Sequence, residues 1–353
     1  MLAATIAPIG DKTRAESFMI DIDFLWVGEK AKTGDAITCQ FTDPETGQDV
    51  VIVIDGGFVE TGDRIASHVR RYYGTSRIDL VICTHPDDDH IRGLFTLIEQ
   101  LDVARLLIHR PADYGYTGDN VKSELVDDLI ATAHDNGTIV DGGFAGTTYF
   151  GGALTVAGPS EAYYKELLAE QVEYSSLTAS IGRALSKAAS TVKEAIRSLG
   201  SDPGETMTGD NGGTTPRNNT SIVTNLEIDG NRALFTGDAG VPALNRAADH
   251  LDAASKSSTI DFFDVPHHGS RHNLDRDTLT RLLGPIVGDY PVGSAFVSIG
   301  KEADEFPRPE VANALRRRGH PVRATRGINI RWNRGAAGRA DYSPVEAIDW
   351  LQE

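Results

Sequence analysis

The stretch Thr84-His85-Pro86-Asp87-Asp88-Asp89-His90 decides how this chain is expected to fold. It follows a continuous apolar run, Ile78–Cys83, which is typical of a strand buried on both faces of a sheet, and it precedes a helical pattern from Ile91 to Leu101. A short loop at the end of such a strand can point several side chains into one cleft. Carboxylates packed this closely repel one another unless a proton or a cation intervenes, and histidine together with carboxylate suits a divalent ion. We therefore expect a metal site at the carboxyl end of this strand.

Two later signals have the same form of a polar cluster at the end of an apolar strand. Asp238 lies in Thr236-Gly237-Asp238-Ala239 after the predicted strand Arg232–Phe235, and His267 and His268 follow the predicted strand Ile260–Val265. Each signal is weak alone, because most aspartates in such turns are turn or helix-cap residues. The three signals in this order are much more specific than any one of them.

Around these motifs, short strands alternate with helical patterns, which predicts mixed sheets. The remaining predicted strands lie in residues 17–57, 103–108, 138–157, 221–228, 295–299 and 322–332, and the predicted helices near 61–73, 120–136, 241–253, 275–284 and 309–318.

Residues 160–216 differ from the rest, and we interpret them as an insert. Apolar residues at spacings of three and four from Leu177 to Leu199 predict an amphipathic helix or helical hairpin, followed by a Gly/Ser/Thr-rich loop. The stripe fits packing on the core, with a lid or a dimer contact as alternatives.

Composition limits the function classes. The chain has 353 residues and a net charge of -17 from 34 basic and 51 acidic side chains, with ordinary globular composition. This excludes wholesale disorder and argues against a protein that coats nucleic acid by charge alone. Cys39 and Cys83 cannot build a disulfide framework and are interpreted as reduced core residues. No signal peptide is evident and no apolar run reaches membrane-spanning length, so we expect a soluble, cytoplasmic protein without a membrane partner.

Charge is unevenly distributed. Residues 301–340 hold ten basic and four acidic side chains, a net charge of +6. Such a run is most often a solvated face, and the alternative is a surface that contacts a phosphate backbone beside the metals.

The motifs His85–His90, Thr236–Asp238 and His267–Ser270 together resemble the metallo-β-lactamase fold. More narrowly, they resemble the soluble hydrolase domain attached to the bacterial competence DNA-uptake channel (ComEC-like). The resemblance covers about residues 20–332 apart from the insert, and further stretches agree with that branch: Gly34–Ile37, Ile54–Gly57, Asn218–Ser221, Val297–Gly300 and Pro307–Val311.

The resemblance implies an α/β (α+β) four-layer αββα sandwich, with residues 1–353 as a single domain and 160–216 as an insert within it. It implies two divalent ions, Zn²⁺ or Mn²⁺ with Mg²⁺ as a further option. Carried over by position, the expected ligands are His85 and Asp87 for the first ion, Asp89, His90 and His267 for the second, and Asp238 between them. Asp89 is also expected to orient the attacking hydroxide, and His268 to act on the leaving group.

The sequence departs from the wider family at the first ion. Asp87 replaces the usual second histidine, and a separate histidine before the Thr236–Asp238 turn has no counterpart, Asn218 or Asn219 being nearest. We expect the first ion to be weakly held by an oxygen-rich set, which favours Mn²⁺ or Mg²⁺ beside Zn²⁺. Phe306 also stands where the narrower branch often has a histidine.

A bridged metal pair makes hydroxide available near neutral pH and stabilises the oxygens of an in-line displacement. The chain is therefore expected to be a metal-dependent phosphodiesterase or nuclease acting on DNA, RNA or nucleotides. The alternatives are a hydrolase of lactones or other acyl compounds, and a non-catalytic regulatory module on the same fold. Expected substrate contacts are Asn218, Asn219, Ser270 and Lys301, and His109 and His272 are further histidines that could reach the same edge.

Overall fold

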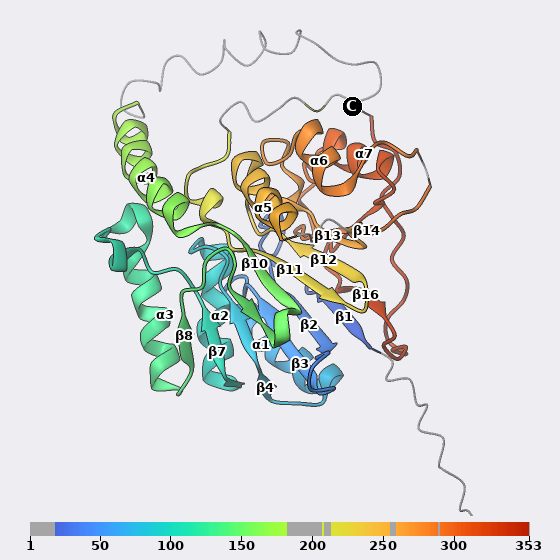
Figure 1. Ribbon diagram of the computed structural model, residues 1–353, viewed down its shortest axis with the longest axis horizontal. Coiled ribbons are helices and arrows are strands. Elements are labelled where there is room, and N and C mark those ends of the chain that lie inside the picture. The colour runs from blue at the N-terminus through green and yellow to red at the C-terminus, as the bar shows by residue number, and fades with distance from the viewer. Residues whose placement is uncertain (1–17, 182–206, 208–212, 255–258, 289, 353) are drawn as a thin grey trace, which may run out of the picture.

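The computed structural model describes residues 18–181, 207, 213–254, 259–288 and 290–352, and residues 177–181 are described by their backbone alone (Figure 1). Within these ranges, every helix is too short or too polar to serve as a bilayer-spanning segment.

Two seven-stranded sheets form the centre of the fold. In spatial order the first sheet contains β16 (Ile330–Arg334), β1 (Ile20–Phe24), β2 (Ile37–Thr42), β3 (Asp49–Ile54), β5 (Leu80–Ile82), β7 (Arg105–Leu107) and β8 (Ile139–Asp141). The second contains β15 (Val322–Ala324), β14 (Ser294–Val297), β13 (Phe262–Asp264), β12 (Asn231–Phe235), β11 (Val223–Ile228), β10 (Leu154–Gly158) and β9 (Thr148–Tyr149). A separate short pair joins β4 (Arg77–Ile78) to β6 (Asp102–Val103). Both large sheets combine parallel and antiparallel pairs, as expected.

Helices cover the outer face of each sheet (Figure 1). On the first sheet these are α1 (Val59–His68), continued by a π-helical turn (Val69–Tyr73), α2 (Asp88–Gln100) and α3 (Ser123–Asp135). On the second they are α4 (Glu161–Ile181), α5 (Val241–Ala253), α6 (Arg276–Leu283) and α7 (Pro309–Arg317). Short 3-10 turns occupy Pro111–Tyr114, Asp119–Val121, Phe150–Gly152, Asn218–Thr220 and Pro266–Gly269. The αββα sandwich is confirmed.

Strand alternation explains how one sheet is buried on both sides. In β3, Val51 and Val53 pack toward the helices, whereas Ile52 and Ile54 pack between the sheets. Aromatic rings lock the sheets together, because Phe262 of β13 contacts Phe24 of β1 and its neighbour Phe296 in edge-to-face geometry at 5.7 and 5.1 Å.

Several elements differ from the sequence prediction. The apolar run Ile78–Cys83 is divided between β4 and β5, and the strand predicted over 103–108 between β6 and β7, because β4 and β6 pair with each other in the separate short sheet. Helix α2 begins at Asp88 rather than Ile91, because the amides of His90 and Ile91 donate to the Asp87 carbonyl and the acidic first turn suits a helix N-terminus. The strand predicted over 322–332 is two strands in different sheets, β15 and β16, because Arg326 and Gly327 have left-handed φ values of 37° and 83° and turn the chain.

The insert is described only in part. Its helix α4 buries Tyr163 and Leu167 against the core outside the second sheet, and Tyr164 and Leu168 in a smaller aromatic cluster. The predicted apolar stripe from Leu177 to Leu199 lies almost wholly outside the described residues, as does most of the predicted Gly-rich loop.

Three arginines of the basic C-terminal region have partners inside the fold. Arg331 and Arg339 form ion pairs with the buried Asp21 at 2.6 and 2.8 Å, and Arg339 also pairs with Asp23 at 2.8 Å. Arg318 is buried and donates to backbone carbonyls. Buried aspartates outside residues 301–340 therefore neutralise part of the +6 charge of this region.

These arginines anchor the last segment of the chain across both sheets. Residues 336–352 pass from Arg339 on the first sheet to Ile348, whose amide donates to the Val322 carbonyl of β15 at 2.8 Å, and to Leu351, which pairs with Asn313 of α7. The segment therefore ties the two sheets together at one edge.

Replacing Arg339 by alanine should destabilise the protein by about 3 kcal/mol, because it leaves the buried Asp21 and Asp23 short of a partner. Burial raises the pKa of Asp23, but His68 and Arg339 outweigh it and hold the pKa below the ordinary 3.8. The ionised Asp23 therefore stabilises the fold above pH 3.8, and this stabilisation is lost as the pH falls below that value. The difference in unfolding free energy between the wild type and Arg339→Ala should accordingly become smaller in acid. Denaturant unfolding at several pH values measures it. As a control, Arg92→Ala breaks an exposed pair with Asp88 and should cost under about 0.5 kcal/mol.

Candidate metal centre

Asp238 is the centre of the candidate site. It follows β12, and its side chain is almost completely buried. Its amide donates to Ser221 Oγ at 3.1 Å and its carbonyl accepts from Asn273 Nδ2 at 2.8 Å, so the backbone is held on both sides. Gly237 precedes it with a left-handed φ of 51°, and a Cβ there would lie 2.9 Å from Thr84 Oγ1. Glycine therefore lets the Asp238 turn approach the strand end that carries His85.

Two histidines reach Asp238 from the first sheet. His90 Nε2 lies 3.4 Å from Asp238 Oδ1, and His85 Nε2 lies 3.7 Å from Asp238 Oδ2. The Nδ1 atom of each ring is held from behind, in His90 by Asp55 Oδ2 at 2.7 Å and in His85 by Thr84 Oγ1 at 3.1 Å. Such contacts behind the ring fix its orientation and leave Nε2 as the atom that can bind a metal, as in metal-binding histidines.

Two further histidines approach from the turn after β13. His267 Nε2 lies 3.5 Å from Asp238 Oδ2, whereas His268 Nε2 lies 3.7 Å from Asp89 Oδ2. Their Nδ1 atoms contact Asn273 Oδ1 and the Ser298 carbonyl, each at 3.0 Å. Both residues have left-handed φ values, 49° and 57°, a conformation that costs about 1–3 kcal/mol per non-glycine residue and is typical of functional sites.

Four of the side-chain atoms that converge here and could bind a metal have no hydrogen-bond partner. His85 Nε2, His90 Nε2, His268 Nε2 and Asp238 Oδ1 are all buried and unpaired. Buried polar atoms are normally paired, so four such atoms in one place indicate that something else binds them. Nitrogen and carboxylate donors together fit a divalent cation, and these residues can hold one.

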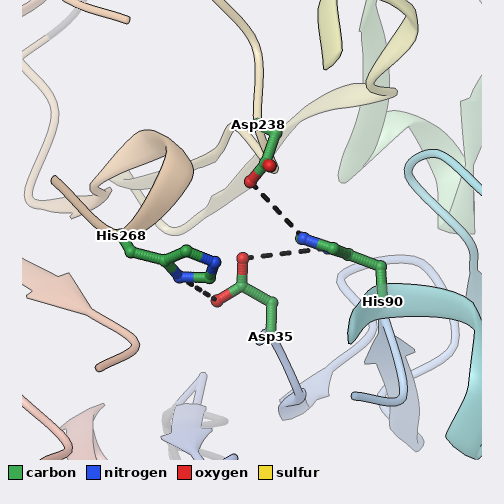
Figure 2. Close-up of side chains that lie close together, drawn as sticks. All are labelled: Asp35, His90, Asp238 and His268. Atoms are coloured by element: carbon green, nitrogen blue, oxygen red, sulfur yellow. Dashed lines mark ion pairs between the residues drawn. The ribbon is translucent and has the colours of Figure 1, made fainter. Parts of the chain in front are cut away.

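The most compact part of the site includes a residue that the sequence analysis did not identify as a ligand. One donor atom from each of Asp35, His90, Asp238 and His268 lies within 4.8 Å of the others, and Figure 2 shows the four side chains facing one another. Asp35 precedes β2, and its amide donates to the Asp89 carbonyl at 3.1 Å. In the sequence, Asp35 stood out only as part of Gly34–Ile37, one of the stretches that match the narrower branch of the family.

Asp55 is a second residue of the site that stood out in the sequence only as part of a matched stretch, Ile54–Gly57. Its Oδ1 accepts from the Thr84 amide at 2.8 Å, and its Oδ2 contacts Thr84 Oγ1 and His90 Nδ1. It therefore fixes the strand end and the His90 ring together. The sequence feature that could have identified Asp55 is its position at the end of an apolar strand, the same feature that identified His85 and Asp238.

The electrostatics of the site demand positive charge. Burial raises the pKa of Asp35, and neighbouring His268 and His90 offset only part of this effect. Burial lowers the pKa of His268, but Asp35, Asp89 and Asp238 outweigh it and raise the pKa to about 9. The pKa of His90 is raised well above its usual range for the same reason, burial being outweighed by Asp238, Asp55 and Asp89. A bound divalent cation would supply the same compensating charge.

The three consecutive aspartates have different surroundings. Asp87 Oδ2 lies 3.6 Å from His85 Nε2, and its other oxygen pairs with Arg217. Asp89 faces His268, whereas Asp88 points away and pairs with Arg92 at 2.8 Å and Lys122 at 3.4 Å. The helical start of α2 at Asp88 separates them, because neighbouring residues on a helix face different directions.

The expected substrate contacts are unevenly placed. Asn218 Nδ2 donates to Asp238 Oδ2 at 3.2 Å, so Asn218 belongs to the cluster, whereas Asn219 Oδ1 accepts from the Gly240 amide and fixes the chain before α5. Ser270 accepts from the His272 amide through Oγ at 3.3 Å. Lys301 is exposed and lies beside Gly327.

The further histidines lie outside the compact group. His109 contacts the Gly143 carbonyl through Nε2 and stacks on Phe144 at 4.1 Å, and burial lowers its pKa to about 4. His272 presents its carbonyl to Thr214 Oγ1 at 2.9 Å.

Comparison with known proteins gives one family match. A model of the metallo-beta-lactamase superfamily matches residues 45–285. A Thermotoga maritima protein described as a candidate metallo-beta-lactamase is similar at 13% identity and a TM-score of 0.37, over 69% of this chain and 94% of its own. The metallo-beta-lactamase SMB-1 bound to 2-mercaptoethanesulfonate is similar at 12% identity and a TM-score of 0.34, over 73% and 84% respectively. No curated protein matches the chain.

Replacing Asp55 by asparagine should weaken divalent-ion binding by about 10–100-fold, the usual effect of losing a partner behind a metal-binding histidine. Asparagine tolerates the left-handed φ of 58° at this position but no longer offers a carboxylate to His90. Calorimetric titration of metal-free protein with Zn²⁺ and Mn²⁺ measures the change. As a matched control, Asp88→Asn alters an aspartate beside the site that faces away from it, and should leave the affinity unchanged. Equal affinities in all three proteins would contradict the role of Asp55.

Proposed function

Because the chain belongs to the metallo-β-lactamase superfamily, we propose that it is a metal-dependent phosphodiesterase or nuclease. The observation that carries the proposal is the convergence of four histidine Nε2 atoms and three carboxylates around the buried Asp238. The three carboxylates are Asp35, Asp87 and Asp89. Such a centre suits hydrolysis of an anionic substrate, because cations held there offset the charge of a phosphate transition state.

We assign the residues to two sets that share Asp238. His90, His268, Asp89 and Asp35 form the compact set, and His85, His267 and Asp87 form the other, with Asn218 beside it. In this assignment His268 takes the place beside Asp89 and His90 that the sequence predicted for His267, and His267 moves to the other set. The reason is geometric, since His268 faces Asp89 and His267 faces the Asp238 oxygen nearest His85. In this assignment His267 is the second histidine of the His85 set, for which the sequence has no counterpart before the Thr236–Asp238 turn.

When bound, Zn²⁺, Mn²⁺ or Mg²⁺ would lower the pKa of water and polarise the phosphoryl oxygen. The role of Asp89 follows from its position at the start of α2, where its side chain is 30% exposed and therefore reachable by substrate. We propose that its carboxylate accepts a proton from the attacking water and orients it. Asp55 and the Ser298 carbonyl hold the Nδ1 protons of His90 and His268, which keeps both Nε2 atoms directed at the centre.

The resemblance to the hydrolase domain of the competence channel supports the substrate class. Three of the matched stretches contribute to the site, because Asp35 lies in Gly34–Ile37, Asp55 in Ile54–Gly57 and Asn218 in Asn218–Ser221. We therefore propose DNA, RNA or a nucleotide as the substrate.

Replacing Asp238 by alanine should lower kcat/KM on phosphodiesters by more than 100-fold, because the loss of a central carboxylate should exceed the 10–100-fold usual for a partner behind a ligand. Activity is measured on linear single- and double-stranded DNA, RNA and cyclic dinucleotides with Mn²⁺, Mg²⁺ or Zn²⁺. Asp88→Asn, whose side chain faces away, should keep wild-type activity.

Lactones and other esters complete the panel and test the alternatives. Turnover of esters without turnover of any phosphodiester would replace the proposal with an acyl hydrolase. A folded, metal-loaded protein that is inert on every substrate would indicate a regulatory module.

A further inference from the structure

We propose that Arg217 forms an anion subsite beside the metal centre and binds a non-bridging oxygen of the phosphodiester. This inference rests on the proposed function and names the residue that recognises the charge of the substrate. Arg217 lies directly before Asn218, and the sequence analysis attached no role to it.

The guanidinium of Arg217 lies at the edge of the candidate centre. It forms an ion pair with Asp87, whose other oxygen lies 3.6 Å from His85 Nε2. The side chain is 26% exposed, so it is partly desolvated and still reachable by a bound molecule. Its contact with Asp87 uses Nε, and within the described residues the two terminal nitrogens make no other ion pair or hydrogen bond.

The backbone of Arg217 is held by hydrogen bonds on both sides of the residue. Its amide donates to Oε1 of the buried Gln171 at 3.1 Å, and its carbonyl accepts from Thr220 Oγ1 at 2.6 Å and from the Thr220 amide at 3.0 Å. The side chain lines a shallow depression together with Pro86 and Tyr164. The side chain itself is restrained by its ion pair with Asp87, which reduces the conformational freedom that it can lose when a ligand binds.

Gln171 belongs to α4, so the insert contributes directly to the position of Arg217. The contacts run from Gln171 to Arg217, to Asp87 and then to His85. The described part of the insert thus does more than cover the core, because it holds the backbone of the residue whose side chain pairs with Asp87.

The chemistry of the residue fits a phosphoryl group. Arginine presents several donors in a planar fork that matches phosphate oxygens, and a charge-assisted hydrogen bond is about twice as strong as a neutral one. Three arginines of the basic C-terminal region are less suited to this role, because Arg331 and Arg339 pair with buried aspartates and Arg318 donates to carbonyls.

Three variants test the subsite: Arg217→Ala, Arg217→Lys and Gln171→Leu, with Arg92→Ala as the matched control. Arg92 pairs with Asp88, the residue next to the partner of Arg217, but on the exposed side of α2. Each metal-loaded protein is titrated with inorganic phosphate by calorimetry, its metal content is measured, and KM and kcat are determined with bis(4-nitrophenyl) phosphate.

Arg217→Ala should weaken phosphate binding and raise KM by about 10–100-fold, since a hydrogen bond to a charged group contributes about 1.5–3 kcal/mol, while metal content and kcat change little. Arg217→Lys should recover part of the loss, and Gln171→Leu should act in the same direction with a smaller effect. Arg92→Ala should match the wild type. Unfolding temperatures establish that each variant is folded. If Arg217→Ala does not fold, the comparison is made with Arg217→Lys, which keeps the charge.

Unchanged phosphate affinity in Arg217→Ala would overturn the inference. Loss of metal in proportion to the loss of phosphate binding would also overturn it, because Arg217 would then act only by holding Asp87. If the wild type hydrolyses no phosphodiester, the proposed function fails, and the phosphate titration still decides the subsite independently.

Discussion

The need to balance buried negative charge at one edge of the sandwich organises this structure. Asp35, Asp87, Asp89 and Asp238 lie close together, and three of the unpaired donor atoms that face them are histidine Nε2 atoms. Carboxylates in such a setting are tolerated only with compensating positive charge. Strand ends from both sheets deliver these side chains to the same place.

Behind the centre, a second group of contacts makes the arrangement rigid. Asp55 joins the Thr84 strand end to the His90 ring, and Asn273 holds both the Asp238 carbonyl and the His267 ring. The left-handed backbone at His267 and His268 is strained, and strain of this kind persists only where the surroundings fix it. These supports favour a site that is formed before a ligand binds.

Charge has two separate uses in this chain. Some of the C-terminal arginines, such as Arg331 and Arg339, balance buried aspartates far from the candidate centre and anchor the final segment to both sheets. Arg217 has a different position, because it contacts a carboxylate of the centre itself. Net charge by segment therefore gives little information on where an anionic ligand binds, since a paired arginine contributes to the count without presenting a free charge.

From the sequence, local patterns predicted mixed sheets and the strand ends that carry polar clusters, because alternation of apolar residues and the chemistry of His85–His90, Asp238 and His267–His268 are local properties. The order of the layers was implied only by the resemblance that these motifs carry. Only the tertiary structure decided which side chains meet. Asp35 and Arg217 lie in stretches that look like ordinary turns, and their contacts join positions far apart in the chain. Which carboxylate each of the two adjacent histidines faces also depends on the left-handed backbone at His267 and His268. The spacing in the sequence cannot reveal this, because one change of φ redirects a whole side chain.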